Sequence, residues 1–144
     1  LASEGQFYNS DGSSIGNQMT ISGINAKAAE LSNGNIIITS GNSTITGKII
    51  DRFGNEVKPE FNVYDDPRGP EQQSSVVALK EGGFAVTWQA DAQDGDDFGI
   101  YLRIYSNEGN PVTDTILANT NTYIATKSSS TDHNLSTYIA LGIF

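Results

Sequence analysis

The chain has 144 residues, with 8 Lys plus Arg against 17 Asp plus Glu, and its formal net charge is −9. This length is enough for one domain with a substantial core. The acidic balance argues against nucleic acid or an anionic membrane surface as a partner. No apolar run approaches the roughly 20 residues that a membrane-spanning helix needs, and the lack of Cys excludes a disulfide framework and a thiolate metal site.

The first predicted elements are two strands joined by a glycine turn at Gly12, and the same pattern returns around Gly54 and Gly109. Counted from each glycine, apolar residues stand three, seven and nine places on. These residues are Ile15, Met19 and Ile21 in the first copy, Val57, Phe61 and Val63 in the second, and Val112, Ile116 and Ala118 in the third. Matches at three positions in three copies indicate a tandem repeat.

The other half of the unit repeats as well. Residues 31–39 align with residues 79–87, and a degraded third copy lies at residues 133–140. The full unit is an approach strand, a glycine turn, a central strand, a variable loop, a third strand, a second glycine turn and a fourth strand. Residues 25–30 contain helix-forming residues but occupy the approach-strand position, so we expect a strand or irregular structure there.

The best-preserved copy shows the strand signal most clearly. Phe84, Val86 and Trp88 alternate with smaller or polar residues, and Ile100, Leu102 and Ile104 alternate in the same way. A period of two is typical of strands with one buried face. The only Trp, Trp88, is therefore predicted to lie in the core.

We expect a single all-β domain over residues 1–144, made of antiparallel strands from about three degenerate four-strand repeats. Residues 73–118 form the best-preserved repeat and residues 24–63 another. Residues 1–22 supply only the third and fourth strands of a unit, and residues 123–144 only the first two. A barrel, a sandwich or a propeller-like module fits this pattern, although three units fall below the roughly 4–8 blades that are usual for propellers.

The phase of the repeat predicts an assembly. Each incomplete set of strands leaves backbone donors and acceptors open, which proteins normally avoid. The two segments can pair within one molecule, or the N-terminal segment can add its strand to a neighbouring molecule and so build a filament. The residues expected at this contact are Phe7, Tyr8, Ile15, Met19, Ile21, Tyr138 and Ile139.

A family resemblance rests on several short motifs. Residues 82–91, Gln93-Asp94-Gly95, Gly99-Ile100-Tyr101 and residues 107–112 resemble one unit of a tandem β-repeat family. That family occurs in large secreted bacterial proteins that are adhesin-like or calcium-binding and have propeller-like repeats. Ser40 departs from the pattern, because it stands where the family has Trp. The resemblance implies an extracellular or cell-surface location and a structural or adhesive role, with no shared enzymatic activity.

An acidic loop is the candidate metal site. Asp91, Asp94, Asp96 and Asp97 lie within seven residues, and clustered carboxylates suit Ca²⁺. Their spacing is not that of an EF-hand, and the alternative is a solvated acidic loop that keeps a sheet edge soluble. We expect no other cofactor.

Two further features point to glycans. Tyr101 alternates with Ile100 and Leu102, so it lies on the opposite face and is the candidate for an exposed sugar-stacking ring. Asn42 and Asn134 begin triplets of the N-glycosylation type, which chance also produces in a chain of this composition.

The sequence predicts no enzyme. His133 is the only His, and no G-x-S-x-G motif accompanies it. We therefore expect a non-enzymatic extracellular structural protein that assembles with itself into a surface filament or adhesin. The alternative is a carbohydrate-binding, lectin-like β module that uses Tyr101 and depends on calcium.

Overall fold

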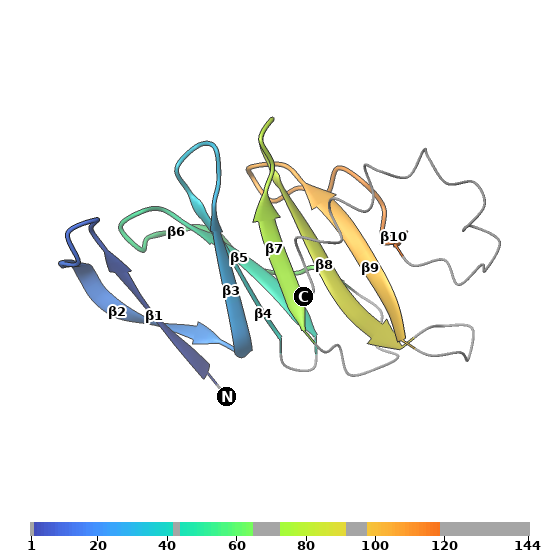
Figure 1. Cartoon of the computed structure of the whole chain (residues 1–144), viewed down its shortest axis with the longest axis horizontal. Helices are drawn as coiled ribbons and strands as arrows, with labels where there is room; N and C mark the ends of the chain where they lie inside the picture. Colours follow the sequence, from blue (N-terminus) through green and yellow to red (C-terminus); the bar gives the residue numbers. More distant parts are fainter. Residues whose placement is uncertain (1, 42–43, 65–72, 92–97, 119–144) are drawn as a thin grey trace.

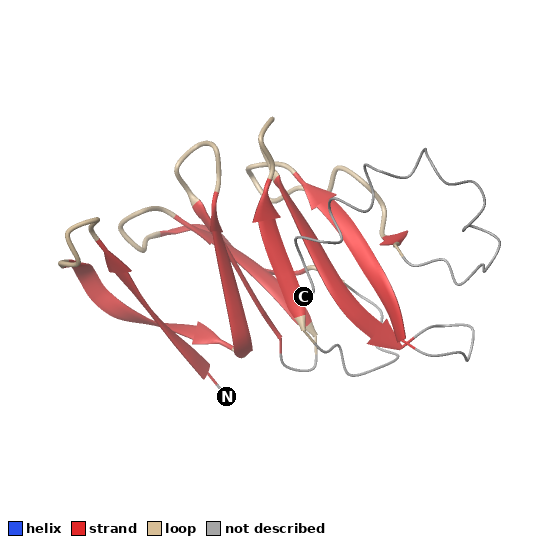
Figure 2. Ribbon diagram, in the orientation of Figure 1, coloured by secondary structure: helices blue, strands red, loops and turns tan. Residues whose placement is uncertain are grey.

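The computed structural model describes residues 2–41, 44–64, 73–91 and 98–118. These residues form ten strands in three antiparallel sheets and contain no helix (Figures 1 and 2). The prediction of an all-β fold with antiparallel strands is confirmed. The described strands form no closed barrel.

Within each sheet, strands that are consecutive in the sequence pair with each other, so sheet A is a hairpin and sheets B and C are meanders. Sheet A contains β1 (Ala2–Tyr8) and β2 (Ser14–Ser22). Sheet B contains β3 (Ile24–Glu30), β4 (Ile36–Gly41), β5 (Ile45–Ile50) and β6 (Glu56–Asn62). Sheet C contains β7 (Ser74–Ala78), β8 (Phe84–Asp91), β9 (Phe98–Tyr105) and β10 (Ile116–Leu117). Residues 25–30, expected to be strand or irregular, are part of β3.

Five hairpin loops share one geometry and lie on the upper side of the molecule in Figure 1. Each loop has five residues. The N–H of the first residue donates to the carbonyl of the fifth, and the N–H of the glycine at the fourth position donates to the carbonyl of the first. The loops are Asn9–Ser13, Leu31–Asn35, Asp51–Asn55, Leu79–Gly83 and Ser106–Asn110. Their glycines have φ between +77° and +103°, which residues with a side chain rarely adopt. The repeat in the sequence is therefore a repeat of backbone hydrogen bonds.

The main core lies between sheets B and C. Sheet B and the residues that follow it contribute Ile37, Ile45, Ile49, Val63 and Tyr64. Sheet C contributes Phe84, Val86, Trp88, Tyr101 and Tyr105. The alternation correctly predicted that Phe84, Val86 and Trp88 share a buried face, since all three side chains are fully buried.

Gly47 makes room for an aromatic ring in this core. Phe61 lies opposite Gly47 in the β5–β6 ladder, and a Cβ on Gly47 would stand 2.7 Å from the Phe61 ring. The Phe61 ring centroid is 5.8 Å from that of Tyr105 in sheet C. The missing side chain at Gly47 therefore lets Phe61 lie flat over its own sheet and reach the neighbouring one.

One asparagine connects three hairpins across sheets B and C. The Oδ1 atom of Asn107 accepts a 2.7 Å hydrogen bond from the Gly83 backbone N–H. Its Nδ2 atom donates to Ser32 Oγ at 3.0 Å. Nearby, Lys58 Nζ donates to the Gly109 carbonyl at 2.8 Å. These contacts fix the loop ends of the two four-stranded sheets to one another.

Candidate functional site

The outer side of β1 is the structural feature that sets sheet A apart. The β1–β2 hairpin has the same loop hydrogen bonds as β5–β6 and β9–β10, so β1, β5 and β9 are equivalent strands. β5 is paired on both sides, with β4 and β6, and β9 is paired with β8 and β10. Among the described residues β1 pairs only with β2. We call the side of β1 that faces away from β2 the open edge.

The backbone groups at the open edge follow from the alternation of an antiparallel ladder. Two equivalent bonds fix its phase: Val63 N–H donates to the Ile45 carbonyl, and Ala118 N–H donates to the Ile100 carbonyl. The corresponding residue of β1 is Ser3, which therefore directs its backbone groups toward β2. Every second residue of β1, starting from the one after Ser3, directs its backbone N–H and C=O groups to the open edge. These residues are Glu4, Gln6 and Tyr8.

The side chains of sheet A separate into two faces. The face toward sheet B carries half-buried residues, and Met19 and Phe7 both approach Gly54 at the tip of the β5–β6 hairpin. The opposite face is mostly polar: Gln18 donates a 2.7 Å bond to Glu4 there. It also carries the exposed aromatic ring of Tyr8. Sheet A is thus anchored by one apolar face and presents a mostly polar one.

Gln6 stabilises an irregular part of the hairpin. Gly5 pairs with Met19 and Phe7 with Ile15, so β2 has two more residues than β1 between these pairs. The Gln6 Nε2 atom fills the gap by donating to the Ile15 carbonyl at 2.9 Å. The hairpin is therefore held by a side chain as well as by its ladder.

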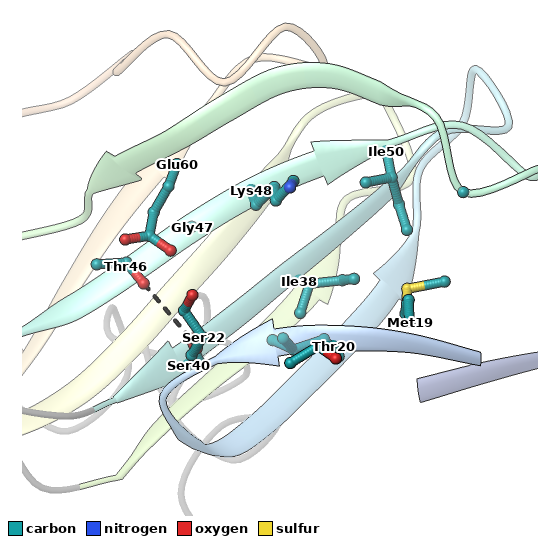
Figure 3. A pocket seen from close by; sticks show the side chains of 12 residues that line it. Met19, Thr20, Ser22, Ile38, Ser40, Thr46, Gly47, Lys48, Ile50 and Glu60 are labelled. Carbon is teal, nitrogen blue, oxygen red and sulfur yellow. Dashed lines mark hydrogen bonds between the residues drawn. The ribbon is translucent and has the colours of Figure 1, made fainter. Parts of the chain in front are cut away.

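A cavity of about 110 Å³ lies between β2 and sheet B, where it is lined mainly by the central strands β4 and β5 (Figure 3). Its apolar part includes Met19, Ile38 and Ile50, and its polar part includes Ser40 and Thr46, whose hydroxyl oxygens are 3.4 Å apart. Ser40 Oγ also donates to the Ser22 carbonyl at 2.5 Å. The polar side chains Ser40 and Thr46 of this cavity thus already bond within the protein. Compared with this interface between sheets A and B, the interface between sheets B and C has a more continuous apolar core.

The sequence-predicted assembly residues of the N-terminal segment all lie on the β1–β2 hairpin. Phe7, Ile15, Met19 and Ile21 are half-buried, whereas Tyr8 is 63% exposed. Tyr138 and Ile139, their expected partners, lie outside the described residues.

The expectation of an exposed Tyr101 is wrong. Tyr101 is buried, and its ring centroid is 6.0 Å from those of both Trp88 and Tyr64. It does lie opposite Ile100 and Leu102, but this is the face that packs on sheet B. Alternation placed Tyr101 on the correct face of β9 but wrongly assigned that face to solvent. Leu102 on the other face is buried too, so neither of these two side chains is open to solvent.

The candidate metal and glycan-attachment residues cannot be placed in a site. Asp94, Asp96, Asp97, Asn42 and Asn134 lie outside the described residues, and so does the side chain of Asp91. Within residues 2–41, 44–64, 73–91 and 98–118, no group of three or more His, Cys, Asp or Glu side chains could hold a metal ion.

Two carboxylates at hairpin tips have perturbed acidity. The Ser13 hydroxyl, 2.6 Å from Asp11 Oδ1, lowers the pKa of Asp11, and the Ser13 backbone N–H adds to this effect. The Asn55 side-chain amide lowers the pKa of Asp51 in the same way. Both carboxylates act as acceptors that close turns, which is a structural use.

Sequence reasoning missed Asn107 and Gln6, which hold loop and hairpin in place. Nothing in the repeat marks Asn107, because Ser10 and Arg52 stand at its position in the other two copies. Gln6 stands where the other copies have the cations Lys48 and Arg103. This change from a charged side chain to an amide was the only sign in the sequence that Gln6 has a role of its own.

No protein-family model, curated protein or solved structure matches the chain. The part of the chain that the structure describes contains no helix that is long and apolar enough to cross a membrane.

Proposed function

We propose that this chain is a non-enzymatic extracellular structural protein, a subunit of a surface filament or adhesin, whose copies join by β-strand addition at the open edge of β1. The observation that carries the proposal is strand pairing. β5 and β9 have partners on both sides, whereas β1, their equivalent, pairs only with β2 among the described residues. The chemistry offered to a partner is a row of backbone donors and acceptors at Glu4, Gln6 and Tyr8.

Physical arguments support such an edge as an acceptor. A sheet of two strands is marginally stable by itself and gains from further strands. An unprotected edge pairs readily with another chain, and main-chain hydrogen bonds supply the affinity in strand addition. One of the two outer strands of sheet B, β6, carries Pro59, which has no N–H to offer. β1 contains neither Pro nor Lys, the residues that commonly block edges.

Strand addition from copy to copy gives a filament. The partner strand that we expect from residues 123–144 and the acceptor edge of β1 are different parts of the chain, so the contact is head-to-tail and continues unless the rotation closes a ring. The extracellular location in this proposal rests on the resemblance to secreted repeat proteins. The buried position of Tyr101 leaves no observation that favours the carbohydrate-binding alternative.

A pair of proline variants tests the edge. Glu4 and Thr20 lie opposite each other in the ladder, and each directs its N–H away from the other strand. Glu4→Pro therefore removes a donor from the open edge, and Thr20→Pro removes one from the outer edge of β2, without loss of a bond between the two strands. Glu4→Ala controls for the exposed contact between Glu4 and Gln18.

The assay is sedimentation velocity over rising protein concentration, with negative-stain electron microscopy of the same samples. We expect filaments from the unmodified chain, Thr20→Pro and Glu4→Ala, and monomers from Glu4→Pro. Fluorescence of the buried Trp88 reports whether the B–C core of each variant is folded, and Thr20→Pro controls for the effect of a proline within sheet A. Monomers at every concentration for the unmodified chain, or normal filaments from folded Glu4→Pro, would contradict the proposal.

A further inference from the structure

Tyr8 is exposed where its structural equivalents are buried. Counted from the turn glycine, Tyr8 corresponds to Ile50 in sheet B and to Tyr105 in sheet C. The exposed fraction is 63% for Tyr8, 3% for Ile50 and 2% for Tyr105. A large aromatic ring at the edge of a two-stranded sheet therefore lacks contacts that the same position has elsewhere in the molecule.

Two neighbours bury Tyr105. Within its own sheet Phe84 lies directly opposite, and the two rings stack with centroids 5.0 Å apart and planes 8° apart. In front of it lies sheet B, where the Tyr105 hydroxyl donates to the Val63 carbonyl at 2.9 Å. Ile50 likewise has Ile36 opposite it on β4. Ile50 also faces β2 of sheet A across the cavity that Met19 lines. Each equivalent therefore has both a central-strand partner and a sheet in front of it, and a strand on the open edge would supply the first of these contacts to Tyr8.

Both complete sheets use the same register between central and third strand. In sheet B the pairs are Ile36 with Ile50, Ile38 with Lys48, and Ser40 with Thr46. In sheet C they are Phe84 with Tyr105, Val86 with Arg103, and Trp88 with Tyr101. The third-strand residues of these pairs correspond in β1 to Tyr8, Gln6 and Glu4, the three residues whose backbone faces the open edge.

From this correspondence we infer that the open edge binds its partner strand antiparallel and in one register, with the first apolar residue of the partner against the Tyr8 ring. This inference rests on the proposed function and specifies its contact. The occupant is a strand of the central-strand type from a second copy of the chain. Residues 133–140 carry the third copy of that motif, while the central strands β4 and β8 are already paired on both sides.

The side chains explain why one register is favoured. A shift by one residue turns every side chain of a strand to the other face. A partner strand in the inferred register places an apolar residue opposite Tyr8. The residues of that strand that are equivalent to Ile37 and Thr39 of β4 then lie opposite Phe7 and Gly5. Gly5 is already covered by Met19, because a Cβ there would stand 3.3 Å from Met19 Cγ. The position opposite Gly5 therefore favours a compact side chain.

Disulfide trapping tests the register, because the chain contains no Cys. The Tyr8→Cys chain is mixed, in a glutathione redox buffer, with a peptide of residues 82–90 that carries Phe84→Cys. A matched peptide carries Ala85→Cys, one place out of register. Directly opposite residues have Cα atoms about 5.5 Å apart in a hydrogen-bonded pair, a separation that suits a disulfide. The adducts are measured by mass spectrometry.

We expect the Phe84→Cys peptide to form its adduct about tenfold faster than the Ala85→Cys peptide, because the latter cysteine points to the other face. Equal rates, or no adduct with either peptide, would overturn the inferred register. Tyr8 is exposed, so its replacement should leave Trp88 fluorescence unchanged, and this checks the fold.

Full-length chains test the occupant. The Tyr8→Cys chain is mixed with chains that carry one cysteine each at residues 137, 138, 139 and 140. Covalent dimers at alternate positions would support a second copy as the donor. Exclusive formation of an intramolecular disulfide in the corresponding double variants would assign the edge to the chain's own segment and overturn that part. A register-specific peptide adduct without chain-to-chain products would leave the register standing and contradict the proposed filament.

Discussion

Asn107→Ala is the substitution with the clearest consequence for the packing of sheets B and C. The Asn107 side chain accepts from the buried Gly83 N–H at 2.7 Å and donates to Ser32 Oγ at 3.0 Å. Alanine removes both bonds. Gly83 is buried and cannot turn its N–H to water, because its backbone packs so closely against Tyr105 that a Cβ at Gly83 would clash with the Tyr105 carbonyl oxygen. The variant therefore leaves a buried donor without a partner.

The loss in the free energy of unfolding that we expect for each variant depends on which group is left unpaired. An unsatisfied buried N–H costs about 1–3 kcal/mol in the free energy of unfolding. Ser32→Ala removes only the exposed half of the contact, so its cost should be within about 0.5 kcal/mol. Asn107→Asp keeps the acceptor for Gly83 and loses the donor to Ser32. It should therefore resemble Ser32→Ala and not Asn107→Ala.

Urea unfolding followed by Trp88 fluorescence measures these differences, because Trp88 is the only Trp and is fully buried in the B–C core. The assay is run at concentrations where every variant is monomeric by sedimentation. If Asn107→Ala and Ser32→Ala lowered the free energy of unfolding equally, the Gly83 N–H would not need Asn107, and the reasoning would be refuted.

Two further predictions concern the strands and the turns. Gly47→Ala should lower the free energy of unfolding by about 1–3 kcal/mol, because its Cβ would stand 2.7 Å from the Phe61 ring. Gly41→Ala, with no atom within 4 Å of its Cβ, should change it by less than about 0.5 kcal/mol, and equal effects in urea melts would contradict the packing argument. The pKa of Asp51 is lowered below its ordinary 3.8 mainly by the Asn55 amide, so its stabilising contribution is present at neutral pH and is lost as the pH falls through the folded-state pKa. Asp51→Asn should therefore flatten the loss of stability in acid titrations below about pH 4; an unchanged acid profile would show that Asp51 has no such role.

The repeat made much of the fold predictable from the sequence. The turn glycines at Gly12, Gly54 and Gly109 predicted hairpins because a positive φ favours glycine, and all three have it. The alternation of Phe84, Val86 and Trp88 predicted a buried face, and this face packs on sheet B. Local rules sufficed here because each hairpin is closed by residues close together in the chain.

The remaining features depend on contacts between distant residues. Asn107 and Ser32 are 75 positions apart, and no local pattern links them. Alternation assigned Tyr101 to a face but could not tell which face another sheet covers. The candidate edge was predictable in part: the repeat phase marked β1 as a third strand, while the exposure of Tyr8 and the common register required the sheets themselves.

Hydrogen exchange at β1 tests the central claim most directly. Amide exchange is measured by mass spectrometry for peptides that cover residues 2–8 and, as the internal control, residues 56–62 of β6. Concentration of the protein into its assembled state should slow exchange in β1 by about tenfold or more, because Glu4, Gln6 and Tyr8 then have hydrogen-bond partners. Exchange in β6 should not change. Equal exchange of β1 in dilute and concentrated samples would contradict strand addition at this edge.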